Sequence, residues 1–355
     1  TMTYDTLGRR ISLDDPDMGE WLYWYDANGN LTGERDAKGE MISYTYDALH
    51  RLVRKSYPSG QDVEYEYDSP TVPYSIGRRT TVIDASGSTT FYYDELGREI
   101  KTVKSIDGTD YVIERSFDSA GRLTSVEYPD GEVVCYAYNP AGLVEAVVGD
   151  EVYVRRVDYD AQGRITSIEY GNGIRTTKSY DALRLLTLRT NGGAFQDFSY
   201  EYDAAGNITK LVDHLHGAEK TFGYDNLNRL TYAAGPYGIQ YYAYDEIGNL
   251  ICKDGINYEY GQAGEKPHAV TAGSDGFTAG YDPNGNMIWR RDHNGVTSYT
   301  YDFEDRLVGV EREGRSVVEF VYDGAGGRVK KITPLVSRIY IGNLYEVDNL
   351  SLIHI

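Results

Sequence analysis

The stretch Tyr25-Asp26-Ala27-Asn28-Gly29-Asn30-Leu31 decides the fold, because its pattern returns about every 21 residues along the chain. The pattern is an aromatic residue, Asp, two variable residues, Gly, and then Arg or Asn, as again in Tyr159-Asp160-Ala161-Gln162-Gly163-Arg164-Ile165. Sixteen copies open at Tyr4, Tyr25, Tyr46, Tyr67, Tyr93, Phe117, Tyr138, Tyr159, Tyr180, Tyr202, Tyr224, Tyr244, Tyr260, Tyr281, Tyr301 and Tyr322. A fixed short period indicates an array whose units bury their apolar sides against their neighbours, so the 355 residues form one repeat architecture.

Each copy is expected to end one strand of a β-hairpin. The residue two before the opening aromatic is itself aromatic in eleven of the sixteen copies, as in Tyr23 and Tyr25, and this period of two indicates a strand with both rings on one face. The following Asp favours an Asx-type turn, and the Gly column favours a left-handed conformation. A second turn, such as Asp36–Gly39 or Tyr57–Gly60, lies halfway through many repeats and completes the hairpin.

The repeat motif supplies all the site residues that the sequence predicts, and their predicted role is structural. They are Tyr25, Asp26, Gly29, Tyr46, Asp47, Tyr93, Asp94, Gly97, Arg98, Tyr159, Asp160, Gly163, Arg164, Tyr202, Asp203, Gly206, Tyr244, Asp245, Gly248, Tyr281, Asp282, Gly285, Tyr322 and Asp323.

The number of hairpins predicts the overall fold class. Sixteen hairpins would give about 32 strands, and open twisted sheets of more than about ten strands curl or split. A sheet this wide that curls must surround a lumen larger than its side chains can fill. The chain has 35 Tyr but only 8 Phe and 3 Trp. Because Tyr has an apolar ring and a polar hydroxyl, this composition favours a wall in contact with solvent over a buried core. The sequence therefore predicts an all-β, hollow, spiralling antiparallel shell.

Charge and composition restrict the partners. The formal charge of −20, with a pI near 4.7, argues against nucleic acid or an anionic membrane surface as a partner. No apolar run approaches the roughly 20 residues of a membrane span. Cys135 and Cys252 fall at different positions of their repeats, which favours two unpaired cysteines.

The motif resembles the YD repeat of the Rhs (rearrangement hotspot) family, which includes bacterial polymorphic toxins, shell components of insecticidal toxin complexes, and animal teneurins. The resemblance covers about residues 3–347, and Arg338–Val347 is similar to the segment that follows the last repeats in bacterial members, which indicates a bacterial source. It implies a shell that encapsulates and sequesters a C-terminal toxin or effector of the same polypeptide. It also implies a secreted or cell-surface location, reached through a secretion system.

The resemblance also sets the expected boundaries. Residues 1–347 are expected to be the repeat shell, incomplete at both ends, and 348–355 a tail outside the pattern that reads like translated sequencing adapter. The shell-closing core, the N-terminal plug and the cargo are expected to lie outside this chain. Asp282-Pro283-Asn284-Gly285-Asn286 is similar to the family's cleavage sequence, but it is assigned to the turn after Tyr281.

No catalytic, cofactor or metal site is predicted. The Asp column could form a calcium ladder, but its Gly stands fourth instead of sixth in the loop. His214 and His216 could lie on one strand face as half of a zinc site, yet no third ligand is near in sequence. Gly324–Arg328 resembles a phosphate loop but is read as a turn.

One alternative function stays open. Exposed Tyr rings stack well on sugars, so the repeats could instead form a carbohydrate-binding or cell-surface adhesion module. Rings that face a lumen favour a container, whereas rings that face outward favour glycan binding.

Overall fold

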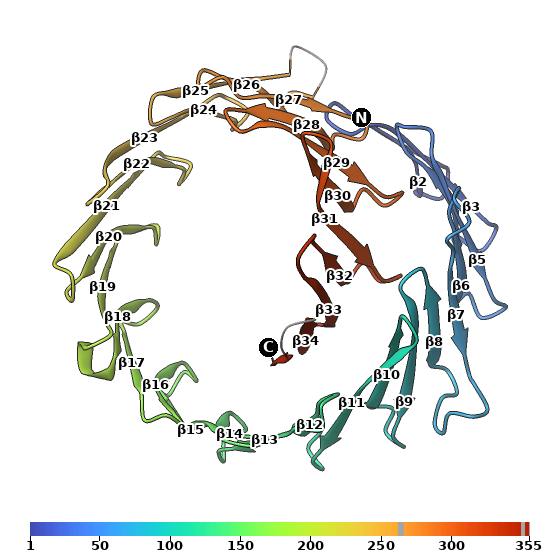
Figure 1. Ribbon diagram of the computed structural model, residues 1–355, viewed down its shortest axis with the longest axis horizontal. Coiled ribbons are helices and arrows are strands. Elements are labelled where there is room, and N and C mark those ends of the chain that lie inside the picture. The colour runs from blue at the N-terminus through green and yellow to red at the C-terminus, as the bar shows by residue number, and fades with distance from the viewer. Residues whose placement is uncertain (262–265, 349–351, 355) are drawn as a thin grey trace. The chain divides into compact units, whose positions relative to one another are not determined.

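The computed structural model describes residues 1–261, 266–348 and 352–354, and contains thirty-five β-strands and one 3₁₀ helix (Figure 1). Consecutive strands pair antiparallel from β1 through β10 and from β11 through β35. The predicted all-β class, built from tandem antiparallel hairpins, is confirmed.

The chain divides into two compact units, one of residues Thr1–Ile113 with Tyr258–Ile355 and one of residues Glu114–Asn257. The first unit holds β1 (Met2–Tyr4), β2 (Arg10–Asp15), β3 (Gly19–Tyr25), β4 (Leu31–Arg35), β5 (Met41–Tyr46), β6 (Leu52–Ser56), β7 (Val63–Tyr67), β8 (Arg79–Asp84), β9 (Gly87–Tyr93), β10 (Glu99–Ile106), β26 (Val270–Gly273), β27 (Thr278–Tyr281), β28 (Met287–Asp292), β29 (Gly295–Tyr301), β30 (Leu307–Arg312), β31 (Arg315–Tyr322), β32 (Arg328–Ile332), β33 (Ser337–Ile341), β34 (Tyr345–Asp348) and β35 (Leu352–His354).

The second unit holds β12 (Leu123–Glu127), β13 (Val133–Tyr138), β14 (Val144–Val148), β15 (Val152–Tyr159), β16 (Ile165–Tyr170), β17 (Arg175–Tyr180), β18 (Leu185–Thr190), the 3₁₀ helix η1 (Asn191–Gly193), β19 (Gln196–Tyr202), β20 (Ile208–Asp213), β21 (Ala218–Tyr224), β22 (Leu230–Gly235), β23 (Gly238–Tyr244) and β24 (Leu250–Lys253). The strands β11 (Thr109–Phe117) and β25 (Ile256–Tyr260) run across the division.

A register shift marks the end of the strand in nearly every copy. Trp24 pairs with Gly33, but the next residue, Tyr25, pairs with Leu31, so Thr32 on the partner strand β4 is the extra residue opposite the motif aromatic. The same shift precedes Tyr159 and Tyr322. Such bulges increase the local twist of a sheet, and their recurrence adds twist once per repeat. The sequence pattern did not predict them.

We call the side of the sheet that carries the motif aromatics the tyrosine face. Directly opposite residues share a face, so the pairing of Lys104 with Thr89, two residues before Phe91, places Lys104 on this face, and Ile106 follows by alternation. Val82 lies there as well, opposite Tyr65.

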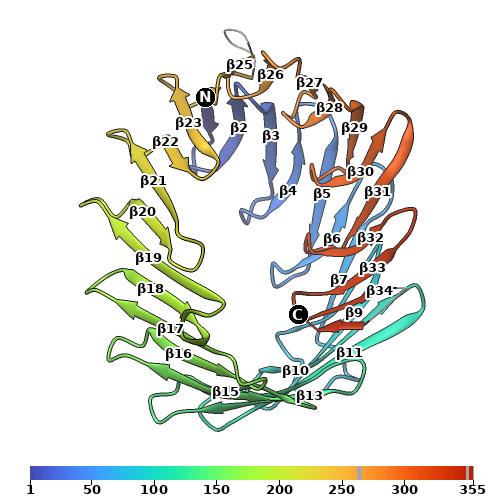
Figure 2. The same cartoon turned by 60° about the vertical axis from the view of Figure 1, so that its left-hand side comes forward.

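In the first unit, the last repeats cover part of the tyrosine face of the first repeats. The strands β31 to β34 lie on one side of β7 to β10 in Figure 1 and overlap them in the turned view of Figure 2. The Tyr65 hydroxyl donates to the Gly324 carbonyl (3.4 Å), and a Cβ built on Gly324 would meet Val63 at 2.4 Å. Lys104 is 7% exposed and Ile106 0%. The first unit therefore has a two-layered region with a buried interior.

Candidate functional site: the repeat turn and the seam

The carboxylate of the motif Asp organises each turn. In the copy at Tyr25, Asp26 Oδ1 accepts the backbone amides of Asn28 and Asn30, each at 2.9 Å. Asp26 Oδ2 accepts the Asn30 side-chain amide at 2.7 Å. In the copy at Tyr159, Arg164 takes the place of that Asn and donates its Nε to Asp160 Oδ2 at 2.7 Å. Each Asp is therefore engaged in closing its own turn.

The motif Tyr and Arg bind neighbouring copies to one another. The Tyr159 hydroxyl donates to the carbonyl of Val144 in the preceding copy (2.6 Å). The Arg164 guanidinium lies 4.4 Å from the ring centroid of Tyr180 in the following copy and donates to the Asp181 carbonyl (3.0 Å). Equivalent stacking occurs for Arg9 on Tyr25, Arg51 on Tyr67, Arg122 on Tyr138, Arg229 on Tyr244 and Arg306 on Tyr322. The motif is thus a device for joining nearest neighbours.

The Gly column adopts the left-handed conformation that its composition predicts. Gly163 has a φ of 79°, and the residues that replace Gly in three copies, His50, Asn228 and Asp305, have φ values of 62°, 61° and 58°. This prediction is confirmed for the described copies.

We expect Gly163→Val to lower the denaturant midpoint more than Arg164→Ala. A β-branched residue at positive φ is strained by up to about 3 kcal/mol. A partly exposed ion pair, one hydrogen bond and one cation–π contact together contribute about 2 kcal/mol. Urea unfolding followed by circular dichroism would compare the two variants, and equal losses would contradict the ranking.

The pKa values of the motif residues Asp47 and Asp160 are lowered, and that of the motif residue Tyr46 is raised. The pKa of Asp47 lies below its usual value, because its carboxylate accepts the Arg51 amide and then the Arg51 guanidinium. At Asp160 burial raises the pKa, but hydrogen bonds from Arg164 outweigh it and the net pKa is lowered. Burial raises the pKa of Tyr46, and Asp26 adds to this effect.

These shifts predict a pH window of stability. Lowered Asp pKa values contribute stability that is present above the unfolded value of about 4 and is lost as the pH falls through the folded values. Raised Tyr pKa values contribute stability that is lost as the pH rises above about 10. We therefore expect a melting temperature that is nearly constant from about pH 5 to 9 and falls on both sides. An unchanged melting temperature at about pH 3 would contradict the Asp contribution.

A second polar feature, which we call the seam, joins the first and last repeats within the first unit. Its residues are Asp17, Asp36, Lys38, Lys55, Asp84, Lys104 and Asp107 from the first repeats, and Lys266, His268, Asn284, Glu304, Asp305, Asp323, Gly324 and Lys330 from the last repeats. Among its contacts, Lys55 meets Glu304, Lys330 meets Asp107, and His268 Nδ1 lies 2.7 Å from Asp17 Oδ2. The seam brings together residues more than 200 positions apart.

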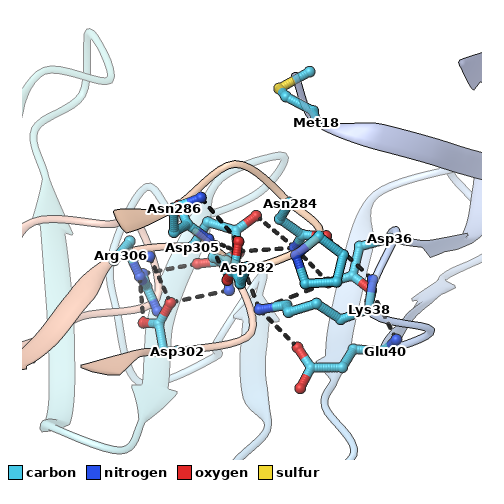
Figure 3. Close-up of polar contacts among 12 residues, drawn as sticks. Met18, Asp36, Lys38, Glu40, Asp282, Asn284, Asn286, Asp302, Asp305 and Arg306 are labelled. Carbon is cyan, nitrogen blue, oxygen red and sulfur yellow. Dashed lines mark hydrogen bonds and ion pairs between the residues drawn. The ribbon is translucent and has the colours of Figure 1, made fainter. Parts of the chain in front are cut away.

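The Lys38 ammonium and the Asn284 amide stand at the centre of the seam (Figure 3). Lys38 Nζ lies 3.1 Å from both Asp305 Oδ1 and Glu40 Oε2. Burial by itself lowers the pKa of Lys38, but hydrogen bonds to Glu40 and Asp305 outweigh it and raise the pKa. Lys38 is thus held charged between two turns.

Lys104 completes a motif copy that lacks its own cation. The last copy has Gly327 where eleven of the other copies have Arg or Asn, so no side chain from that position reaches Asp323 Oδ2. Lys104 Nζ lies 2.6 Å from this oxygen instead. Asp323 Oδ1 keeps its usual role and accepts the amides of Ala325 and Gly327.

The remaining candidate residues from the sequence analysis lie in turns and strands of the repeats. His214 and His216 lie in the turn after β20, not on one strand face as half of a zinc site would require: His214 contacts the Ser199 hydroxyl and His216 contacts Asp213. Gly324–Arg328 forms a turn that leads into β32. Cys135 and Cys252 are free. Of the tail, Asp348 ends β34 and Leu352–His354 form β35, while residues 349–351 and 355 lie outside the described residues.

Two searches concern only the part of the chain that the structure describes. No group of three or more His, Cys, Asp or Glu side chains there is arranged to hold a metal ion. No helix there is long and apolar enough to cross a membrane.

Known proteins share the repeats and the fold. The teneurin YD-shell family matches residues 144–297, and the RHS repeat matches residues 25–62 and 117–151. A curated relative, double-stranded DNA deaminase toxin A of Burkholderia cenocepacia (strain H111), is 29% identical over 93% of this chain, which spans 25% of that protein. This chain therefore corresponds to about a quarter of that relative.

Solved structures show the same fold. The crystal structure of TcdB2-TccC3-Cdc42 matches 99% of this chain, with 18% identity and a TM-score of 0.81, over 22% of its own chain. A structure of the Photorhabdus luminescens Tc holotoxin pore matches 99% of this chain, with 18% identity and a TM-score of 0.79, over 21% of its own chain. With sixteen motif copies and matches to both the teneurin YD-shell and the RHS repeat, this chain is an array of Rhs (YD) repeats.

Proposed function

We propose that residues 1–347 are a non-catalytic segment of an Rhs shell that encapsulates a C-terminal toxin or effector of the same polypeptide and keeps it sequestered until delivery. The cargo, the shell-closing core and the N-terminal plug would belong to the rest of that polypeptide. Delivery by a secretion system would place the protein outside the producing cell or at its surface. A toxin relative and the fold shared with TccC3-containing complexes support the proposal.

One observation carries the proposal. Instead of extending the sheet away from the first repeats, the last repeats pack onto the tyrosine face of β7 to β10 through the seam. The chain after β34 is thereby directed to the side of the sheet that carries the Tyr rings. A cargo that follows these repeats would start on that side, as a container with Tyr-lined walls requires.

The motif side chains support a structural role. The motif Asp of most copies is engaged by backbone amides and an Arg or Asn of its own turn, as at Asp26 and Asp160, and Asp323 is engaged by Lys104 instead. A group held in this way is committed to the turn. We therefore assign any catalytic activity of the parent protein to the cargo.

The test is toxicity of the full-length parent in its host, with and without residues 1–347. We expect the intact protein to be harmless and the deletion to be toxic, with equal amounts of effector verified by immunoblot. The effector domain expressed alone serves as the positive control. A deletion that is as harmless as the intact protein, beside a toxic effector domain, would refute containment.

A second candidate function, glycan binding, is favoured by one exposed patch. On the face opposite the tyrosine face, Tyr232 and Tyr241 pair directly, with 38% and 61% exposure. The Tyr232 ring lies over Gly223, where an added Cβ would meet it at 2.0 Å, so the absent side chain of Gly223 leaves room for the ring. Exposed aromatic rings suit stacking on sugars. We expect a glycan-array signal that Tyr241→Ala abolishes, and no signal from the unaltered chain would dismiss this candidate.

A further inference from the structure

A single neutral amide holds two carboxylates together at the centre of the seam (Figure 3). Asn284 Nδ2 donates to Asp36 Oδ2 at 2.6 Å and to Asp305 Oδ1 at 2.9 Å, and Asn284 Oδ1 accepts the Lys38 backbone amide at 3.2 Å. Asn284 and Asp36 are each 5% exposed. Both the oxygen and the nitrogen of the Asn284 side-chain amide are thus hydrogen-bonded. The nitrogen lies between carboxylates from two turns that are distant in sequence.

The surroundings of this amide carry more negative than positive charge. Asp36 and Glu40 approach from the earlier turn, Asp282 belongs to the same turn as Asn284, and Asp305 comes from the next copy, whereas Lys38 is the ammonium in contact with the group. A carboxylate at position 284 could not donate to either acid and would add repulsion in a buried place. An open pocket of about 290 Å³ lies beside the seam at Tyr57, Phe303 and Arg306, so close packing does not extend along its whole length.

We propose that Asn284 is a charge-sensitive lock of the seam, and that Asn284–Gly285 is a deamidation site whose conversion keeps an opened seam from closing. Asn followed by Gly cyclises readily, because Gly presents no side chain to the attacking backbone. The Gly285 nitrogen attacks Cγ of Asn284 and forms a succinimide. The Cγ–Nδ2 bond breaks, the Nδ2 group takes up the Gly285 amide proton, and ammonia leaves. Water then opens the ring to aspartate or isoaspartate.

The closed seam protects Asn284 from this reaction. The Gly285 amide donates to the Asp282 carbonyl at 3.1 Å, which directs the nucleophilic nitrogen into the turn. The Asn284 side chain is fixed by its two carboxylates. Cyclisation requires both groups to turn toward each other, so the seam must open first. After conversion, Asp36 and Asp305 would face a third carboxylate, and reclosure would be opposed.

The chain contains a matched control for this site. Asn28–Gly29 occupies the same two positions of its own repeat and lies in the first unit too, but Asn28 is exposed. The backbone amide of Gly29 donates to the Asp26 carbonyl at 3.2 Å, as that of Gly285 does to the Asp282 carbonyl at 3.1 Å. The two Asn-Gly pairs therefore share local sequence and turn geometry and differ in burial within the seam.

The first experiment measures opening by hydrogen exchange of the Gly324 amide, which donates to Asp84 Oδ2 at 2.7 Å elsewhere in the seam. We expect Asn284→Asp to speed its exchange by at least about tenfold, equivalent to about one pKa unit of added repulsion. Asn28→Asp should leave it unchanged. Asn284→Asp combined with Asp305→Asn restores the charge count and a donor, and should restore protection.

Two results would overturn the lock. One is unchanged protection in Asn284→Asp. The other is exchange in Asn284→Ala as fast as in Asn284→Asp, because loss of the hydrogen bonds alone would then explain opening. If Asn284→Asp does not fold, the double variant and Asn284→Ala still test the role of charge. A double variant in which the Gly324 amide is not protected from exchange would refute that role.

The second experiment follows deamidation by peptide mapping during incubation at neutral pH. We expect Asn28 to convert faster than Asn284 in the unaltered protein. Lys104→Met, which weakens the seam at a distance from Asn284, should speed conversion at 284 and leave 28 unaffected. Equal deamidation rates at Asn28 and Asn284 in the unaltered protein would refute the claim that the closed seam protects Asn284. An unchanged rate at Asn284 in Lys104→Met would refute it as well.

Discussion

Replacing Lys104 with Met is expected to make opening of the seam easier by about 3 kcal/mol, because removing one partner of a buried ion pair leaves the other charge uncompensated. The Lys104 and Asp323 side chains are 9% and 19% exposed, and their charged atoms lie 2.6 Å apart. Met preserves most of the length of the side chain and removes the charge. Hydrogen exchange of the Gly324 amide, next to Asp323 in sequence, reports the loss locally.

The same site offers a rescue and a control. In seven other copies an Arg five positions after the aromatic supplies the cation for the motif Asp, and in the last copy Gly327 stands at that position. Gly327→Arg should therefore recover much of the protection lost in Lys104→Met. Lys253→Met changes an exposed strand lysine of the second unit and should have an effect within about 0.5 kcal/mol. Equal effects of Lys104→Met and Lys253→Met would show that the pair contributes nothing.

The repeat itself was predictable from sequence because its causes are local. The alternation of Tyr23 and Tyr25 gives the strand, the Asp26 carboxylate caps amides within four residues of it, and Gly29 takes a positive φ that few other residues tolerate. Each of these effects acts within one copy, and the sixteenfold repetition averages out the degenerate copies. Fold class, turns and hairpins follow from such signals.

The seam was not predicted, because it depends on how twist accumulates over many copies. No periodic signal marks Lys38, Lys55 or Lys104 as partners of residues more than 200 positions later. Two deviations from the pattern could have indicated it: Gly327 leaves Asp323 without its own cation, and Asp305 replaces Gly in its column. A motif position that loses its usual partner is a reason to look for a distant one.

Ile106→Ala is expected to lower the free energy of unfolding of the first unit by about 2 to 5 kcal/mol, the range for removing a fully buried aliphatic side chain. Ile106 is 0% exposed and shares the tyrosine face with Lys104, where the last repeats cover the first. A bare single-layered sheet would leave such a residue in water. Its burial therefore depends on the second layer, and the loss should appear as a lower urea midpoint of the first unit.

The matched control is Ile83, on β8, which is 41% exposed. Ile83 pairs with Ser88 and Ser88 with Ser105, so it lies on the opposite face close to Ile106 in the same sheet. Ile83→Ala should cost less than about 1 kcal/mol, because roughly half of its apolar surface is already in water. Ile106→Val should fall between the two Ala variants at about 1 kcal/mol. If Ile106→Ala and Ile83→Ala shifted the midpoint equally, the two faces would be equally solvated and the covering layer would not form in solution.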